Sequence, residues 1–142
     1  KEALMFRLAN KRRNMLTNLR IEVICTWIAT DQEGQSIRKY KHLDVERDHL
    51  SMLPLSWTVV HPIDKESPLL KMSARSCQAV DVEIIVILEA YDDTFANIIR
   101  RHTSYKFDEI IWQAKFDKMF YFNKAGHSVL ELNKVNDYSE LS

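Results

Sequence analysis

The sequence contains few of the residues that cross-link or interrupt a chain: two cysteines, two glycines and three prolines in 142 residues. Two cysteines are too few for a disulfide scaffold, and Cys25 and Cys77 match none of the paired spacings that zinc sites use. We therefore expect reduced thiols inside a cell and no metal site. With so little glycine and proline, the hydrophobic pattern must carry the prediction of secondary structure.

Excess charge and long apolar runs are also absent. Twenty Lys and Arg balance twenty Asp and Glu, so no overall field draws the chain toward nucleic acid, and any electrostatic function must be local. The longest purely aliphatic run, Ile84 to Leu88, falls far short of the roughly 18 apolar residues of a membrane-spanning helix. The length and apolar fraction predict one domain over residues 1–142. Because the chain starts at Lys1 without a signal-like stretch, we expect a fragment whose upstream part is missing.

Alternation of apolar and polar residues with a period of two predicts strands. It is clearest from Leu19 to Ile28, and a turn follows at Glu33-Gly34. The other predicted strands are Leu4 to Leu8, Ile37 to Leu43, Leu55 to His61, Val82 to Tyr91, Ile98 to Tyr105, Glu109 to Phe116, Met119 to Phe122 and Val129 to Leu132. Helix signals are limited to a short turn at Ser67-Pro68 and to Ser73 to Ala79. Many short strands without long helices favour an all-β sandwich or barrel over a parallel α/β fold.

Three polar residues close in sequence, His61, Asp64 and Ser67, raise the alternative of a hydrolase. A hydrolytic triad needs a base oriented by a buried acid and an oxyanion hole, and no G-x-S-x-G elbow is present. We interpret the cluster as a turn held by side-chain hydrogen bonds. His102 is a poor metal ligand, because Arg100 and Arg101 beside it oppose a bound cation.

Two charge clusters remain. Lys11, Arg12 and Arg13 form a basic run after the first predicted strand, and Glu89, Asp92 and Asp93 form an acidic cluster at the end of the most apolar one. Taken alone, the first is typical of a solvated loop and the second of a polar turn.

Several short motifs, in order along the chain, resemble those of the inward-rectifier potassium channel family, in its cytoplasmic domain. Residues 6–12 resemble F-R-x-x-N-x-R, and Glu33-Gly34 resembles an E-G turn. Residues 61–69 match H-x-I-D-x-x-S-P-L, and residues 83–89 match E-I-x-V-I-L-E. Ser104-Tyr105 followed by the DEIIW sequence at 108–112 completes the pattern, which is closer to bacterial members than to animal ones.

The resemblance implies an immunoglobulin-like β-sandwich that assembles as a homotetramer around a pore and catalyses no reaction. It implies a partner in the channel's own transmembrane pore domain, and a location on the cytoplasmic face of the bacterial inner or plasma membrane. It also places the chain in the wider class of voltage-gated channels. Potassium ions would pass the pore, with magnesium or polyamine block and no bound cofactor. The rival interpretation is an unrelated immunoglobulin-like interaction module, since one fold serves many functions.

The same resemblance assigns roles to individual residues. Glu89 and Asp93 match acidic positions that face the cytoplasmic pore, and Asp48 is a further candidate that would compensate in part for Asn18. Asn18 stands where strongly rectifying members carry an acid, so we expect weaker block by multivalent cations. The gating loop would comprise Ala90, where the family has glycine, together with Tyr91, Asp92, Thr94, Phe95 and Ala96. Lys11, Arg12 and Arg13 would bind anionic lipids such as phosphoinositides.

Overall fold

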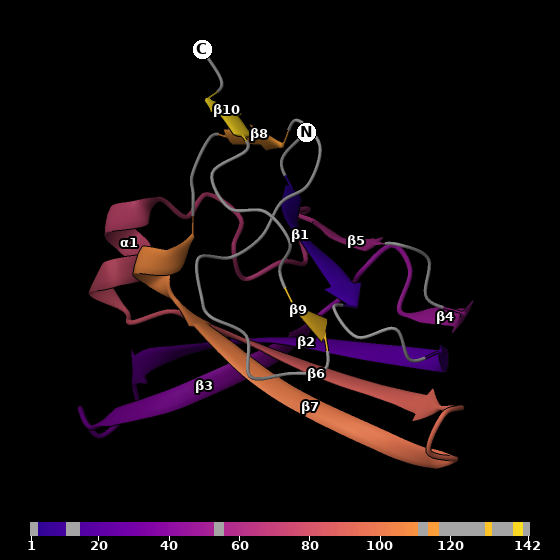
Figure 1. Cartoon of the computed structure of the whole chain (residues 1–142). Coiled ribbons are helices and arrows are strands. Elements are labelled where there is room, and N and C mark those ends of the chain that lie inside the picture. The colour runs from indigo at the N-terminus through magenta and orange to yellow at the C-terminus, as the bar shows by residue number, and fades with distance from the viewer. Residues whose placement is uncertain are drawn as a thin grey trace.

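The computed structural model describes residues 3–10, 15–52, 56–110, 114–116, 130–131 and 138–140. Within these ranges most of the regular structure is β (Figure 1). The strands are β1 (Ala3–Asn10), β2 (Leu16–Thr30), β3 (Ser36–Leu43), β4 (His49–Met52), β5 (Ser56–Pro62), β6 (Glu83–Asp92), β7 (Asn97–Lys106), β8 (Ala114–Phe116), β9 (Leu130–Glu131) and β10 (Tyr138–Glu140). The helical elements are α1 (Ala74–Ala79) and the 3-10 helix η1 (Phe107–Glu109).

The strands form two larger sheets and one short pair. The larger sheet has the order β3-β2-β6-β7, with β4 also paired to β2, and the smaller has the order β5-β1-β9. β8 pairs with β10. All of these pairings are antiparallel, which allows strands to follow one another without helical crossovers. The predicted all-β, immunoglobulin-like sandwich is confirmed.

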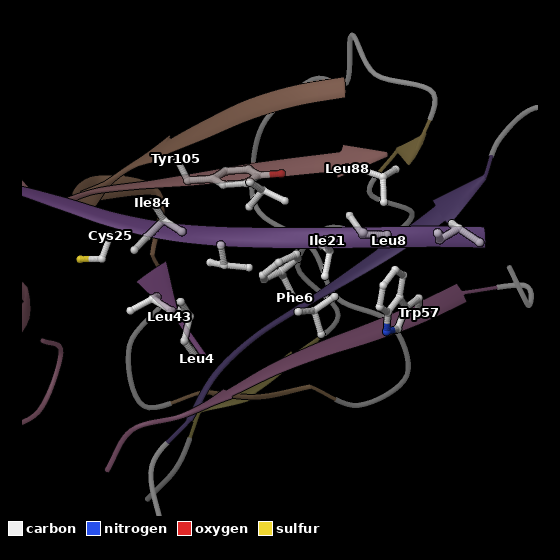
Figure 2. Close-up of a cluster of buried hydrophobic side chains, with 14 of the residues drawn as sticks. Leu4, Phe6, Leu8, Ile21, Cys25, Leu43, Trp57, Ile84, Leu88 and Tyr105 are labelled. Atoms are coloured by element: carbon white, nitrogen blue, oxygen red, sulfur yellow. The ribbon is translucent and has the colours of Figure 1, made fainter. Parts of the chain in front are cut away.

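The core lies between the two larger sheets (Figure 2). Phe6 from β1 is 1% exposed and Ile84 from β6 is 0% exposed. In β6 the side chains of Val86, Leu88 and Ala90 are buried as well, while the residues between them are partly exposed. This alternation is what the sequence predicted, and it leaves the second face of β6 open to solvent.

The predicted helix at Ser73 to Ala79 is present as α1. Ser73 caps it: the Ser73 Oγ accepts the Ser76 N–H at 3.2 Å, and the Ser76 Oγ accepts the Ser73 N–H at 2.7 Å. After the helix, the carbonyl of Val80 accepts the N–H of Ile28 at 2.8 Å. The two serine bonds cap the helix, and the bond from Ile28 holds its C-terminal end against the C-terminal half of β2.

Both cysteines are buried and free. Burial raises the pKa of the Cys25 thiol to about 12, and the nearby Cys77 adds to the effect. Burial also raises the pKa of Cys77. Thiolates react much faster than thiols, so burial and the raised pKa values both lower the reactivity of these two residues.

The predicted turn at Glu33-Gly34 is also confirmed. Gly34 adopts φ +80°, which glycine tolerates without strain. The Asp31 Oδ1 accepts the N–H groups of Glu33 and Gln35 at 2.9 and 2.8 Å. The turn therefore closes the long hairpin of β2 and β3.

Some predicted boundaries are wrong. Glu109, predicted to begin a strand, belongs instead to η1, and of the rest of that predicted strand β8 is described at 114–116. The Glu109 Oε1 accepts the N–H of Lys106 at 2.8 Å and thereby closes a helical turn. β4 was missed, since four residues are too few to show a period. The strand predicted at 119–122 lies outside the described residues, and of the one predicted at 129–132 only β9 is described.

β3 forms an edge of the larger sheet and is exposed along nearly its whole length, with only Leu43 buried. Three of its side chains are Arg38, Lys39 and Lys41. The Arg38 guanidinium donates to the Asp81 carboxylate at 2.6 Å. The Lys41 Nζ donates to a backbone carbonyl at 2.6 Å. The edge strand is therefore basic, and some of its cations are held in place.

Removing the aromatic ring from the core should test this packing. We expect Phe6→Ala to lower the free energy of unfolding by roughly 3–5 kcal/mol, because the buried ring leaves a cavity. Tyr40→Ala is the control, since Tyr40 is 69% exposed and its loss should change stability by less than about 0.5 kcal/mol. Urea denaturation measures both changes. Equal losses in the two variants would contradict the burial of Phe6.

Candidate functional site

The outer face of the larger sheet presents the most specific acidic candidate. Glu89 lies in β6 between Leu88 and Ala90, which are 4% and 1% exposed. Because successive side chains of a strand point to opposite faces, the Glu89 carboxylate points away from the core. Its side chain is partly exposed. The carboxylate is thus available on an open face of the sheet, which the predicted role requires.

Two arginines flank Glu89 on the neighbouring strands. Arg20 of β2 and Arg100 of β7 are its Cα partners, and both are exposed. His49 of β4 is in turn the partner of Arg20. Residues directly opposite each other point to the same face of a sheet, so His49, Arg20, Glu89 and Arg100 form one line across four strands. We call these four residues the charge row.

The charged groups of the row face solvent separately. Within the described part of the chain, no ion pair joins the Glu89 carboxylate to Arg20 or to Arg100. The row therefore carries two exposed guanidinium groups for one carboxylate. Its charge acts on ions in the surrounding water rather than being consumed in a salt bridge.

The other two predicted acids lie near the same end of the sheet. Asp48 directly precedes β4, and its carbonyl accepts the N–H of Ile21 at 2.9 Å. Asp93 directly follows β6, and its N–H donates to the carbonyl of Met15 at 3.0 Å. Both acidic side chains are exposed. The structure therefore brings Glu89, Asp48 and Asp93 to the end of the sheet where β2 begins and β6 ends.

The first part of the predicted gating loop is strand rather than loop. Ala90, Tyr91 and Asp92 are the last residues of β6, and they pair with β7. Ala90 is 1% exposed and does not adopt a positive φ. Alanine therefore fits this position without strain, and the glycine that the resemblance implies here is not needed for the backbone conformation.

The second part of that segment is a tight turn, residues 93–96, between β6 and β7. The Asp92 Oδ1 accepts the N–H groups of Thr94 at 2.9 Å and Phe95 at 3.4 Å. Ala96 adopts φ 52°, a left-handed conformation that is uncommon outside glycine. Phe95 is 67% exposed at the tip. The turn is thus held by a buried carboxylate and exposes one aromatic ring.

Asn18 lies in an irregular part of β2. The register between β2 and β6 shifts between Thr17 and Arg20, and Asn18 adopts φ 49°, which asparagine tolerates better than most residues. The Asn18 Oδ1 lies 2.7 Å from the Nε2 of His49. Because an amide oxygen only accepts, the ring N–H donates in this bond. Asn18 is therefore attached to one end of the charge row.

The predicted lipid-binding run lies outside the described residues. β1 ends at Asn10, and the description resumes at Met15. Lys11, Arg12 and Arg13 therefore belong to the connection between β1 and β2.

His61 and Ser67 form a buried hydrogen-bonded pair. The Nε2 of His61 lies 2.7 Å from the Ser67 Oγ, and its Nδ1 lies 2.5 Å from the carbonyl oxygen of Asp44. A carbonyl oxygen only accepts, so Nδ1 carries the proton and Nε2 accepts the serine hydroxyl. The Ser67 Oγ also accepts the N–H of Leu69 at 3.1 Å. The pair lines a cavity of about 250 Å³.

This geometry meets part of what the hydrolase alternative requires, but not the rest. A triad places a buried acid on the second nitrogen of the base, and here that group is a backbone carbonyl. The Asp64 carboxylate instead accepts the N–H of Glu66 at 2.9 Å. His61 and Ser67 are 4% and 8% exposed, so little of the hydroxyl is accessible from the cavity. The pair fixes a turn, as the sequence predicted.

Comparison with known proteins decides the family. The family model described as "Inward rectifier potassium channel C-terminal domain" matches residues 1–142. The chain belongs to the inward rectifier potassium channel family. This agrees with the all-β fold.

Curated inward rectifiers from bacteria and mammals resemble the chain. Inward rectifier potassium channel Kirbac3.1 of Paramagnetospirillum magnetotacticum is 29% identical over 140 residues, which are 99% of this chain and 48% of the relative. G protein-activated inward rectifier potassium channel 1 of Bos taurus is 35% identical over 124 residues, 82% of this chain and 24% of the relative. ATP-sensitive inward rectifier potassium channel 8 of Homo sapiens is 31% identical over 119 residues, 79% of this chain and 27% of the relative. The chain thus spans about half or less of the length of these relatives.

This inward rectifier domain is not an enzyme, because its relatives are potassium channels. The unrelated interaction module is not favoured. The relatives' names describe inward rectifiers and give no support to the wider class of voltage-gated channels. In the part of the chain that the structure describes, no helix is long and apolar enough to cross a membrane.

Sequence reasoning missed the basic members of the charge row. Arg20 and Arg100 lie in predicted strands, but Arg100 was considered only for its effect on a metal at His102, and His49 lies between two predicted strands. Their relation to Glu89 depends on the register of three strand pairs. The period of a single strand predicts which face of the sheet each residue occupies. It does not predict which residues of neighbouring strands lie opposite one another.

The hydrogen bond between His61 and Ser67 predicts a measurable loss of stability. Ser67→Ala should lower the free energy of unfolding by roughly 1–3 kcal/mol, because the buried His61 Nε2 and the Leu69 N–H lose a partner. Ser51→Ala, at an exposed position of β4, is the matched control and should be neutral. Urea titration compares the two variants. A Ser67→Ala variant as stable as the control would show that the bond contributes nothing.

Proposed function

We propose that this inward rectifier domain is the cytoplasmic, pore-lining part of a homotetrameric potassium channel. The observation that carries the proposal is the position of Glu89. This residue ends the E-I-x-V-I-L-E motif that resembles the family's, lies on the open face of β6, and points away from the core. A face that contains a carboxylate and remains open is suited to line water rather than to pack against the rest of the same subunit.

Fourfold repetition gives this carboxylate its effect. One partly exposed acid has little influence on distant ions, because dissolved salt screens its charge within about 8 Å at physiological ionic strength. Four copies around a common axis add their fields in one confined volume, which concentrates potassium and repels anions. Asp48 and Asp93, exposed at the same end of the sheet, extend the acidic region along the pore.

Multivalent cations such as magnesium and polyamines would block the pore by binding in this vestibule. No resident cofactor is needed. Asn18 provides an amide, bound to His49 at 2.7 Å, where a strongly rectifying channel has a carboxylate. Four negative charges per tetramer are thereby absent, and block is correspondingly weaker.

The domain couples to the rest of the channel mechanically. The tight turn at residues 93–96 and the β1–β2 connection lie at the ends of strands of both sheets, and the transmembrane pore domain is the partner. Ligand or lipid binding biases a rotation or displacement of the ring of domains at the cytoplasmic face of the bacterial inner or plasma membrane.

Anionic lipid is the regulator for which the sequence offers a site. Lys11, Arg12 and Arg13 form an uninterrupted basic run in the β1–β2 connection. Each cation near an anionic leaflet contributes about 1 kcal/mol, so three bias a gate appreciably. Phosphoinositides, with their multiple phosphates, are the lipids that such a run holds best.

Neutralising the proposed pore acid should weaken block. In the complete channel that carries this domain, Glu89→Gln should raise the concentration of cytoplasmic spermine needed for half block by about tenfold, because four charges leave the vestibule. Glu33→Gln, exposed in the β2–β3 turn, is the matched control and should leave block unchanged. Planar-bilayer recordings measure both. A complete channel that passes no potassium would refute the proposed function itself.

Removing the basic run should remove lipid control. Arg12→Gln combined with Arg13→Gln should reduce the response of potassium flux to phosphoinositide in reconstituted vesicles, whichever direction that response takes, because the headgroup loses two of its three cations. Arg75→Gln, exposed on α1, controls for the loss of surface charge. An unchanged lipid response in the double variant would eliminate this site.

A further inference from the structure

We infer that Arg20 and Arg100 set the net charge at the level of Glu89 and thereby limit how tightly the vestibule holds multivalent cations. The inference rests on the proposed function and deepens it. The acidic motif of β6 identifies Glu89 alone, whereas the two arginines are identified only by the register of the strands on either side.

The geometry places all three charges at one level of the sheet. Arg20 and Arg100 are the direct cross-strand partners of Glu89 on β2 and β7. Opposite residues in an antiparallel pair have Cβ atoms about 5 Å apart and point to the same face. Any face of this sheet that presents Glu89 to a pore therefore presents both arginines to it as well. The side chain of Glu89 cannot face the pore while those of Arg20 and Arg100 face elsewhere.

The charge balance at this level is positive. Two positively charged guanidinium groups stand beside a single carboxylate. His49 continues the row beyond Arg20, hydrogen-bonded to the neutral Asn18. A vestibule lined by this row is therefore less attractive to cations than the carboxylate alone suggests.

The neighbouring level of the same face carries a different set of charges. Ile87, two residues before Glu89, has Glu22 and His102 as its cross-strand partners. The Glu22 carboxylate lies 3.1 Å from the Nε2 of His42 on β3. Negative charge is therefore found further along the sheet, and the positive balance is confined to the level of Glu89.

The charge of the ion decides whether the arginines mainly affect block by spermine or conduction of potassium. The interaction energy of an ion with a fixed charge grows in proportion to the charge of the ion. Repulsion from Arg20 and Arg100 therefore acts several times more strongly on spermine, a tetravalent amine, than on potassium. We expect the arginines to weaken block while changing conduction little.

The experiment measures spermine block in the complete channel from the cytoplasmic side. Arg20→Gln combined with Arg100→Gln should lower the spermine concentration for half block by about tenfold, after screening by salt is allowed for. Potassium current without spermine should change by less than about twofold, because a monovalent ion is affected least. The conservative variant Arg100→Lys keeps the charge and should leave block as in the unmodified channel.

Arg75→Gln is the matched control, because Arg75 is exposed on α1, which is bound to the other end of β2 through the Val80 carbonyl and the Ile28 N–H. It removes one positive charge per subunit far from the row, half of what the double variant removes, and should leave block unchanged. Block that tightens equally with Arg75→Gln would overturn the inference, since only the total charge would then matter.

The failure of the inference can be told apart from failure of the proposed function. If Glu89→Gln weakens block while the double arginine variant leaves it unchanged, the face lines the pore but the arginines do not set its charge. If neither Glu89→Gln nor the arginine variants alter block in a conducting channel, the pore-facing assignment of this sheet is wrong and the inference falls with it.

Discussion

The register between β2 and β6 is the constraint on which the rest of the molecule depends. β6 is an inner strand, paired with β2 on one side and β7 on the other. Its buried residues, such as Ile84 and Leu88, fill the core, and its remaining residues form the open face. A slip of one residue would exchange the two faces and place Glu89 among apolar side chains. The cost of burying an unpaired carboxylate reinforces the register that the apolar residues already favour.

The two faces of this one strand therefore serve different ends. The inner face supplies apolar area that holds the two sheets together, and it tolerates little change in volume. The outer face contributes much less to packing, so its residues can be chosen for charge. Arg20, Glu89 and Arg100 occupy such positions. Each has a neighbour along its strand that packs in the core or against it. A stable core thus fixes the spacing of charges that need not touch one another.

The sequence predicts the strands well where one face is buried. β2 and β6 show a clear period of two, because burial imposes it. The sequence fails where local hydrogen bonds replace that pattern: Glu109, predicted to begin a strand, accepts the N–H of Lys106 and is the last residue of η1. Glu89 could be found from its motif, whereas its arginine neighbours could not. Register relates two strands, and the sequence of one strand predicts only which of its own residues share a face.

The most specific motif of the chain, residues 61–69, proves to be mainly structural in this subunit. His61 and Ser67 bond to each other inside the fold, Asp64 accepts a backbone N–H in the turn, and Leu69 is buried in the core. Such a segment specifies one conformation, because its buried polar groups would lose their hydrogen-bond partners in any other. A distinctive sequence pattern can therefore mark a turn as readily as a reactive site.

The exposed edge formed by β3 bears on how the domain behaves at high concentration. Unpaired edges invite strands of other molecules to add, and that addition leads to aggregation. Arg38, Lys39 and Lys41 put like charges on this edge, so two copies approaching edge to edge would repel one another. The domain can therefore be crowded beside its own copies without growing into a continuous intermolecular sheet.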